Sequence, residues 1–338
     1  MRRRITIREV AERAGVSIST VSRVLNEKPH DYVKEETRKK VLQAIEELNY
    51  KPDRRAQSLR GAKTGIIGLV MPIGFNPFYE QFSYAIENAC YREDYGLLMC
   101  DSHGDIERER TYIDLLVRQK VDGIILTTMG LKKKDLDELI SRGIIVILAD
   151  EDVPEVNAPA VFANNYLGAC QATQYLVDLG HKSIAFITGP LSILSARDRL
   201  NGYVDTLKKN YLQIDESLIQ EGDYTYKSGY LATKRLLKKK NFTAIFCSND
   251  LMAFGAMRAL QDRGYRIPND YSIVGFDDMY FSSISNPQLT TVSQPVNKMA
   301  QKIFEAFKQE ISGKSPRKKI HRVLNTRLAI RESCRKLT

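Results

Sequence analysis

Polar side chains recur just after apolar segments of this chain, and their types suit hydrogen bonding to a hydroxylated molecule. They stand at 76–79, Asp150, 195–199, Asp223, Tyr224, Asn249, Asp250, Asp277, Asp278 and Gln294. Carboxylates and amides exchange hydrogen bonds with neighbouring hydroxyls, and arginine donates paired bonds. An aspartate after a strand can instead cap the next helix, a role that suits Asp250 and Asp278. Recurrence at six strand ends favours a binding site.

The segments that must position these side chains alternate between short apolar strands and helices from residue 64 onward. Strands are predicted at 65–71, 97–100, 123–127, 144–149, 160–163, 183–188, 244–247 and 273–276. Helices are predicted at 78–93, 106–120, 167–179, 196–210, 227–238, 251–263 and 298–310. Such alternation predicts parallel sheets that are covered by helices on both faces.

The pattern restarts near Asn164, which predicts two doubly wound α/β lobes. We expect the first lobe at about 64–164 and 294–322, and the second at about 165–293 and 323–338, with 290–295 leading the chain back to the first. Open sheets of this kind bind ligands at the carboxyl ends of their strands. The cleft between the lobes is therefore the expected ligand site.

The first 51 residues predict a separate all-α head. Thr6 and Glu9 form a capping-box pattern before a helix at 7–14, and Gly15 suits a left-handed helix end. Ser17 is the next N-cap candidate, ahead of a helix at 18–25, and a third helix is expected at 35–48. Two short helices around a glycine turn have the layout of a helix-turn-helix.

The second helix of such a motif enters the major groove of DNA. Arg23 suits a guanine, Ile18 suits a thymine methyl group, and Ser19 faces the base edges. Hydroxyl groups that suit phosphate contacts belong to Ser17, Thr20 and Ser22. The net charge of +10 is concentrated here, since residues 1–60 carry 15 Lys and Arg against 9 Asp and Glu. A basic head of this kind favours DNA over a plain three-helix packing module.

Other classes of protein are disfavoured. No apolar run approaches the ~18 residues that cross a bilayer, and no secretory signal is present, so we expect a cytoplasmic location without membrane contact. Five scattered cysteines suit a reducing compartment. The four histidines are far apart, and phosphate-loop and nucleophile-elbow motifs are missing. We therefore expect no enzyme, no catalytic or metal site and no cofactor.

The head and the linker after it resemble the lactose/galactose-repressor (LacI/GalR) family. The resemblance rests on 6–11, 15–26 and 44–52 and extends over nearly the whole chain, although the loop 27–34 is longer than usual. It implies that the linker 52–63 forms a hinge helix on DNA, pairs with its twin in a homodimer and inserts Leu59 into the minor groove. The DNA contacts that we assign are Thr6, Ser17, Ile18, Ser19, Thr20, Ser22, Arg23, Asn26, Arg55, Ala56, Ser58 and Leu59.

The resemblance also implies a body like the periplasmic sugar-binding proteins. The effector residues that match are Asn76, Phe78, Tyr79, Asp150, Arg197, Tyr224, Asn249, Asp277 and Gln294. Ribose-type members usually carry arginine where this chain has Glu151, which leaves another pentose, a hexose or a galactoside open. Acidic side chains at Asp150, Glu151 and Asp277 disfavour a phosphorylated or carboxylated ligand. A purine corepressor is disfavoured too, because its expected pocket pattern is missing.

The sequence thus predicts a repressor of carbohydrate-utilisation genes that a neutral sugar releases from a palindromic operator. A regulator of the same family that responds to a protein corepressor is the alternative. An enzyme or a stand-alone binding protein of the same α/β build is disfavoured by the head. The effector's identity, and whether it induces or corepresses, stay open.

Overall fold

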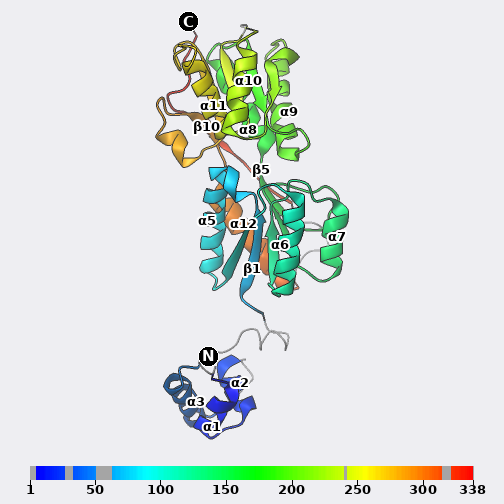
Figure 1. The fold of residues 1–338 in the computed structure, drawn as a ribbon, viewed down its shortest axis with the longest axis vertical. Coiled ribbons are helices and arrows are strands. Elements are labelled where there is room, and N and C mark those ends of the chain that lie inside the picture. Colours follow the sequence, from blue (N-terminus) through cyan, green and yellow to red (C-terminus); the bar gives the residue numbers. More distant parts are fainter. Residues whose placement is uncertain (1–4, 27–32, 51–62, 240–241, 314–320, 338) are drawn as a thin grey trace. The chain divides into compact units, whose positions relative to one another are not determined.

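The computed structural model describes residues 5–26, 33–50, 63–239, 242–313 and 321–337 (Figure 1). The chain divides into two compact units, Met1–Thr64 and Gly65–Thr338. The predicted hinge residues Arg55, Ala56, Ser58 and Leu59 lie outside the described residues. Within the described part of the chain, no helix is long and apolar enough to cross a membrane.

The first unit contains the three predicted helices, α1 (Ile7–Ala14), α2 (Ile18–Asn26) and α3 (Glu35–Glu47). Thr6 and Glu9 form the predicted capping box, and Gly15 ends α1 with a left-handed φ of 66°. The Ser17 hydroxyl accepts a hydrogen bond from the Thr20 amide over 3.1 Å, as an N-cap does. The helices bury a small apolar core built from Val10, Ala11, Val21, Val24, Val41 and Ala44.

The first lobe of the second unit is built on a wholly parallel sheet with the strand order β11-β5-β4-β3-β1-β2. Its strands are β1 (Ile66–Met71), β2 (Gly96–Asp101), β3 (Gly123–Leu126), β4 (Val146–Ala149), β5 (Ala160–Ala163) and β11 (His321–Leu324). The turn η1 (Ile73–Phe75) follows β1, and the helices are α5 (Pro77–Tyr91), α6 (Ile106–Arg118), α7 (Lys133–Ser141) and α12 (Val296–Ile311). Helices α5 and α12 pack side by side (Figure 1), in a cluster that includes Phe82 and Phe307.

The second lobe repeats this plan with the strand order β12-β10-β9-β8-β6-β7. Its strands are β6 (Ile184–Thr188), β7 (Ile219–Glu221), β8 (Ala244–Cys247), β9 (Ser272–Asp277), β10 (Thr290–Ser293) and β12 (Arg327–Ala329), of which only β12 is antiparallel to its neighbour among the described strands. Its α-helices are α8 (Asn165–Asp178), α9 (Leu194–Lys209), α10 (Tyr226–Leu236) and α11 (Asp250–Gln261), and its 3-10 turns are η2 (Glu216–Leu218) and η3 (Tyr280–Ser283). Two doubly wound lobes therefore form, as the alternating pattern predicts.

The chain passes between the two sheets three times, after β5, after β10 and after β11. Strand β11 pairs with β5 as far as Leu324, so the first lobe ends two residues later than the predicted boundary at 322. Strands β7, β10, β11 and β12 have no counterpart among the predicted strands, and the segment that contains β10 was predicted only as the return to the first lobe. All four are three or four residues long, and β7, β11 and β12 are also partly exposed, which leaves too short an apolar pattern for the sequence to reveal.

Candidate functional site

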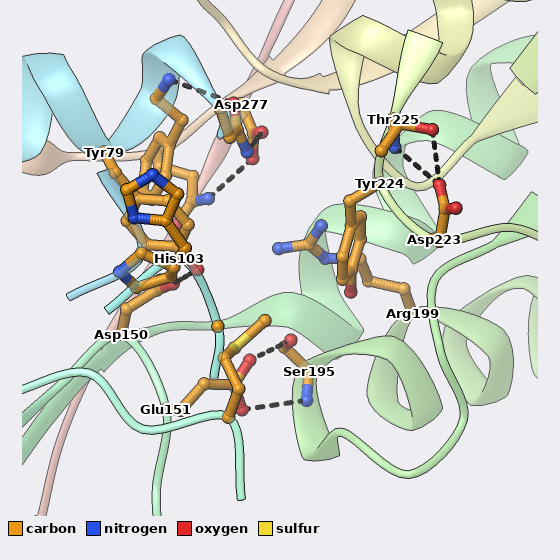
Figure 2. Close-up of a pocket in the computed structure, with 16 residues that line it drawn as sticks. Tyr79, His103, Asp150, Glu151, Ser195, Arg199, Asp223, Tyr224, Thr225 and Asp277 are labelled. Atoms are coloured by element: carbon orange, nitrogen blue, oxygen red, sulfur yellow. Dashed lines mark hydrogen bonds between the residues drawn. The ribbon is translucent and has the colours of Figure 1, made fainter. Parts of the chain in front are cut away.

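A cavity of about 290 Å³ lies between the lobes, where the predicted cleft should be (Figure 2). Its walls are formed by Pro72, Asn76, Phe78, Tyr79, His103, Gly104, Met129, Asp150, Glu151, Ser195, Arg199, Asp223, Tyr224, Thr225, Asp277 and Gln294. Seven of the nine predicted effector residues are among them. The cavity has the size of a small-molecule site and combines aromatic surface with convergent polar groups.

Asp150 follows β4 and lies on the first-lobe side of the pocket. Its Oδ2 accepts a hydrogen bond from the Tyr79 hydroxyl over 3.1 Å, and its Oδ1 has no partner among the described residues. Burial raises the pKa of Asp150, against the influence of Arg199 and Tyr79. An unpaired buried acceptor is costly, so Asp150 is suited to accept from a donor on a ligand.

Asp277 ends β9 and joins groups from different parts of the pocket. Its carboxylate accepts from Gln294 Nε2 over 2.9 Å and from Asn76 Nδ2 over 3.4 Å. Asn76 itself caps α5, because its Oδ1 accepts from the Phe78 amide over 3.0 Å. Burial raises the pKa of Asp277 to about 7, although Arg199 and the two amides lower it. Gln294 Oε1 is buried and, within the described residues, has no partner.

Arg199 supplies the guanidinium of the pocket, which corrects the prediction of Arg197. Arg199 is 5% exposed; its Nε donates to Asn165 Oδ1 over 2.9 Å and its Nη1 donates to the carbonyl oxygen of Ser248. Arg197 is exposed and bonds the carbonyl oxygen of Leu191 over 3.4 Å. Residues 195 and 199 are four apart in α9 and share a face, whereas 197 points away. The sequence pattern at 195–199 identified the helix but not its inward face.

The guanidinium of Arg199 also packs on aromatic rings. Its Cζ lies 3.8 Å from the centroid of the Phe276 ring and 5.9 Å from that of Tyr224. Figure 2 shows Arg199 and Tyr224 on one side of the pocket and Asp150 on the other. Because the planar group is held by two hydrogen bonds and a ring face, it is fixed before a ligand binds.

Asn249 is not on the pocket wall, contrary to prediction. Its Oδ1 caps α11 by accepting from the Met252 amide over 2.9 Å, and its Nδ2 donates to the carbonyl oxygen of Tyr224 over 2.9 Å. Asn249 therefore holds Tyr224 in place from behind. Asp250 is likewise buried under the pocket, where it accepts from the Met279 amide and from the hydroxyls of Ser282 and Thr291.

Glu151 and Ser195 form a contact between the lobes that the sequence did not reveal. Ser195 donates its hydroxyl to Glu151 Oε1 and its amide to Oε2, the latter over 3.4 Å (Figure 2). His103, Met129 and Thr225 also line the cavity without having been predicted, and so does Asp223, which was among the polar residues at strand ends but was not assigned to the effector. His103 follows β2, so a wider search of the strand ends would have found it.

Four pocket residues adopt left-handed backbone conformations: His103, Asp150, Tyr224 and Asp277, with φ of 53°, 67°, 65° and 114°. Each conformation costs on the order of 1–3 kcal/mol for a residue other than glycine. Such strain persists where the surrounding structure fixes it, and it concentrates at functional sites. In the described residues, no group of three metal-binding side chains forms.

On the first unit, the predicted DNA-contact residues lie on and beside α2. Thr6, Ser17, Ile18, Ser19 and Arg23 are exposed, while Thr20 and Ser22 are partly buried. The Ser17 hydroxyl lies 2.7 Å from that of Ser19 and 2.9 Å from that of Thr20, so the helix begins with a cluster of hydroxyl groups. Asn26 is the last residue of α2. Helix α2 carries no acidic residue, which suits a surface that faces phosphates.

Comparison with known proteins matches both units to one family. Residues 6–53 match bacterial regulatory proteins of the lacI family, and residues 64–332 match the periplasmic binding proteins and sugar binding domain of LacI family. The HTH-type transcriptional repressor PurR of Mannheimia succiniciproducens is 31% identical over 98% of this chain and 99% of its own length.

Two solved structures are similar over almost the whole chain. The lac repressor dimer bound to operator and the anti-inducer ONPF is 32% identical with a TM-score of 0.85, and covers 98% of this chain and 99% of its own. A complex of the transcriptional regulator CelR with cellobiose is 33% identical with a TM-score of 0.74, and covers 98% and 100%.

Proposed function

The chain belongs to the lacI family of bacterial regulatory proteins, and we propose that it represses carbohydrate-utilisation genes until a neutral sugar binds between its lobes. The observation that carries the proposal is the composition of the pocket: buried acceptors on Asp150, Asp277 and Gln294 face a fixed guanidinium. Vicinal hydroxyls of a sugar both donate and accept, so they satisfy acceptors and guanidinium together.

The similar regulator CelR is solved with cellobiose, which supports a carbohydrate for this chain. Aromatic rings of Phe78, Tyr79 and Tyr224 offer surface to the apolar face of a pyranose or furanose. The same rings could stack on a planar base, so a purine is the ligand class that competes with a sugar.

DNA recognition in this proposal uses α2 in the major groove, with Arg23 and Ile18 on base edges and the hydroxyls of Ser17, Thr20 and Ser22 on phosphates. A palindromic operator presents two half-sites, which two heads of a homodimer bind about one helical turn apart. The hinge residues Arg55, Ala56, Ser58 and Leu59 add contacts in the minor groove, where Leu59 opens a base step. Thr6 and Asn26 complete the contacts at the two ends of the motif.

Release of the operator follows from a shift between two states of the lobes. A sugar that contacts both lobes favours the closed state, and it shifts the equilibrium only by its difference in affinity for the two states. The closed lobes change the spacing of the paired hinge segments, and the heads then lose their fit to two half-sites.

The test is fluorescence anisotropy of the purified protein on a palindrome from upstream of its own gene, at two salt concentrations. Free pentoses, hexoses, cellobiose, a galactoside and purine bases are added in turn. Specific binding that weakens with salt and is released by one sugar supports the proposal. If only a purine base weakens or strengthens operator binding, the proposal that the effector is a sugar is wrong. If none of these compounds changes operator binding, the alternative of a protein corepressor is favoured.

A further inference from the structure

Glu151 caps a helix of the opposite lobe. Helix α9 begins at Leu194; Ile193 at its N-cap offers no side-chain acceptor, and its first turn holds no acidic residue. Glu151, from the loop after β4, accepts both the amide and the hydroxyl of Ser195 in that first turn. The group that satisfies the start of a second-lobe helix thus comes from the first lobe.

The first turn of a helix attracts anions because its amides lack partners within the helix and its dipole is positive there. In α9 this end faces the pocket, and Arg199 follows one turn later on the same face, also in the pocket wall. Together they make the donor set of a phosphate or carboxylate site. Glu151 is a buried residue, 7% exposed, and its carboxyl group occupies that place.

The surrounding charges reinforce this arrangement. Asp150 and Asp277 are buried beside Glu151 in the same cavity, so three carboxyl groups face one guanidinium. Burial and Asp150 raise the pKa of Glu151 to about 8, against the bonds from Ser195 and the charge of Arg199. With or without its proton, the side chain fills the start of α9, and Asp150 next to it repels a further anion.

We propose that Glu151 determines the charge of the effector: by filling the anion-binding start of α9, it excludes phosphorylated and carboxylated sugars and restricts the pocket to uncharged ones. This inference rests on the proposed function, because the effector binds in the same pocket. Glu151 then selects the ligand by its charge, in addition to joining the two lobes.

The test measures binding of glucose 6-phosphate and of glucose to the full-length protein by isothermal calorimetry, without DNA. Wild type should give no heat with glucose 6-phosphate. Glu151→Ser empties the start of α9, so it should bind glucose 6-phosphate with a Kd about tenfold or more below the weakest Kd that the titration of wild type could detect, as expected for charge-assisted bonds. Asp205→Ser removes an exposed carboxylate from the same helix and should leave wild-type behaviour.

Glu151→Gln is the second variant, and it decides the matter if Glu151→Ser does not fold. It keeps the length of the side chain and removes the charge, so a smaller gain in glucose 6-phosphate affinity is expected. The proposal would be overturned if the folded variants, like wild type, did not bind glucose 6-phosphate. It would also be overturned if wild type bound glucose 6-phosphate tightly. Because DNA is not involved, a gain of anion binding stands even if no sugar releases the operator.

Discussion

Asn76 and Asp277 come from different lobes, and the amide of Asn76 donates to the carboxylate of Asp277 over 3.4 Å. Glu151 and Ser195 make a second contact between the lobes, at another part of the same pocket. Both contacts place a carboxyl group opposite a donor of the other lobe. The side chains that hold the two lobes together therefore also line the ligand pocket.

Asn76→Ser should weaken effector binding while preserving the fold. Serine still caps α5, but its side chain is too short to reach Asp277. Loss of a hydrogen bond to a charged group costs about 1.5–3 kcal/mol, which corresponds to a Kd about ten- to a hundredfold higher. Calorimetry with the releasing sugar measures this, and Asn88→Ser on the same helix is the control. Equal affinities of both variants would count against the contact.

Arg199→Lys should reduce effector affinity at least about tenfold, because lysine cannot reproduce the paired donors of the guanidinium. Arg197→Lys is the matched control, since Arg197 is exposed outside the pocket, and it should stay within about twofold of wild type, as surface changes usually do. Operator release as a function of sugar concentration gives both values. A larger effect at 197 than at 199 would restore Arg197 as the effector-binding arginine.

Asp277→Asn should stabilise the ligand-free protein at neutral pH and weaken its response to the effector. The pKa of Asp277 is about 7 in the folded chain and near 3.8 when unfolded. The unfolded chain therefore releases this proton first, and stability falls as the pH rises from about 4 to about 7. Asparagine removes that loss.

Thermal unfolding between pH 4 and pH 8 checks the prediction. The melting temperature of Asp277→Asn at pH 7 should rise by about 1–2 °C, the shift that about 1 kcal/mol produces in a chain of 338 residues. The difference from wild type should be smallest near pH 4, where the folded wild type is protonated at this position and its unfolded chain is only about half ionised. If Asp277→Asn melts at a lower temperature than wild type at pH 7, the predicted stabilisation is wrong.

Arg23→Gln should weaken binding to the operator about tenfold or more, because a bidentate contact with guanine is worth about 1–3 kcal/mol. Affinity for unrelated DNA should change much less. Lys40→Gln is the control: Lys40 is exposed on α3, and an ion pair of 2.8 Å joins it to Glu36. Anisotropy on operator and scrambled duplexes separates the two effects. Equal losses on both duplexes would reduce Arg23 to a phosphate contact.

Local rules made the head predictable from sequence. Thr6, Glu9 and Gly15 specify the ends of α1 through bonds that span only three or four residues, so their types and spacing suffice. In the body, the alternation of apolar strands and helices likewise predicts two parallel sheets, because buried parallel strands need continuous apolar runs. The edge strands β7, β11 and β12 were not predicted, because their pairing with neighbouring strands defines them and they have no apolar runs of their own.

What the sequence by itself determined is the plan: a helix-turn-helix, two α/β lobes and a cleft at the strand ends with acidic, amide and aromatic side chains. The tertiary structure alone decided which residues meet there. It rotated Arg199 rather than Arg197 into the pocket, turned Asn249 behind Tyr224, and brought Glu151 to the start of α9 in the other lobe. The physical reason is the distance along the sequence over which each kind of interaction acts. Caps and periodicity act within a few residues, whereas these contacts join groups whose approach depends on how two separately folded sheets pack together.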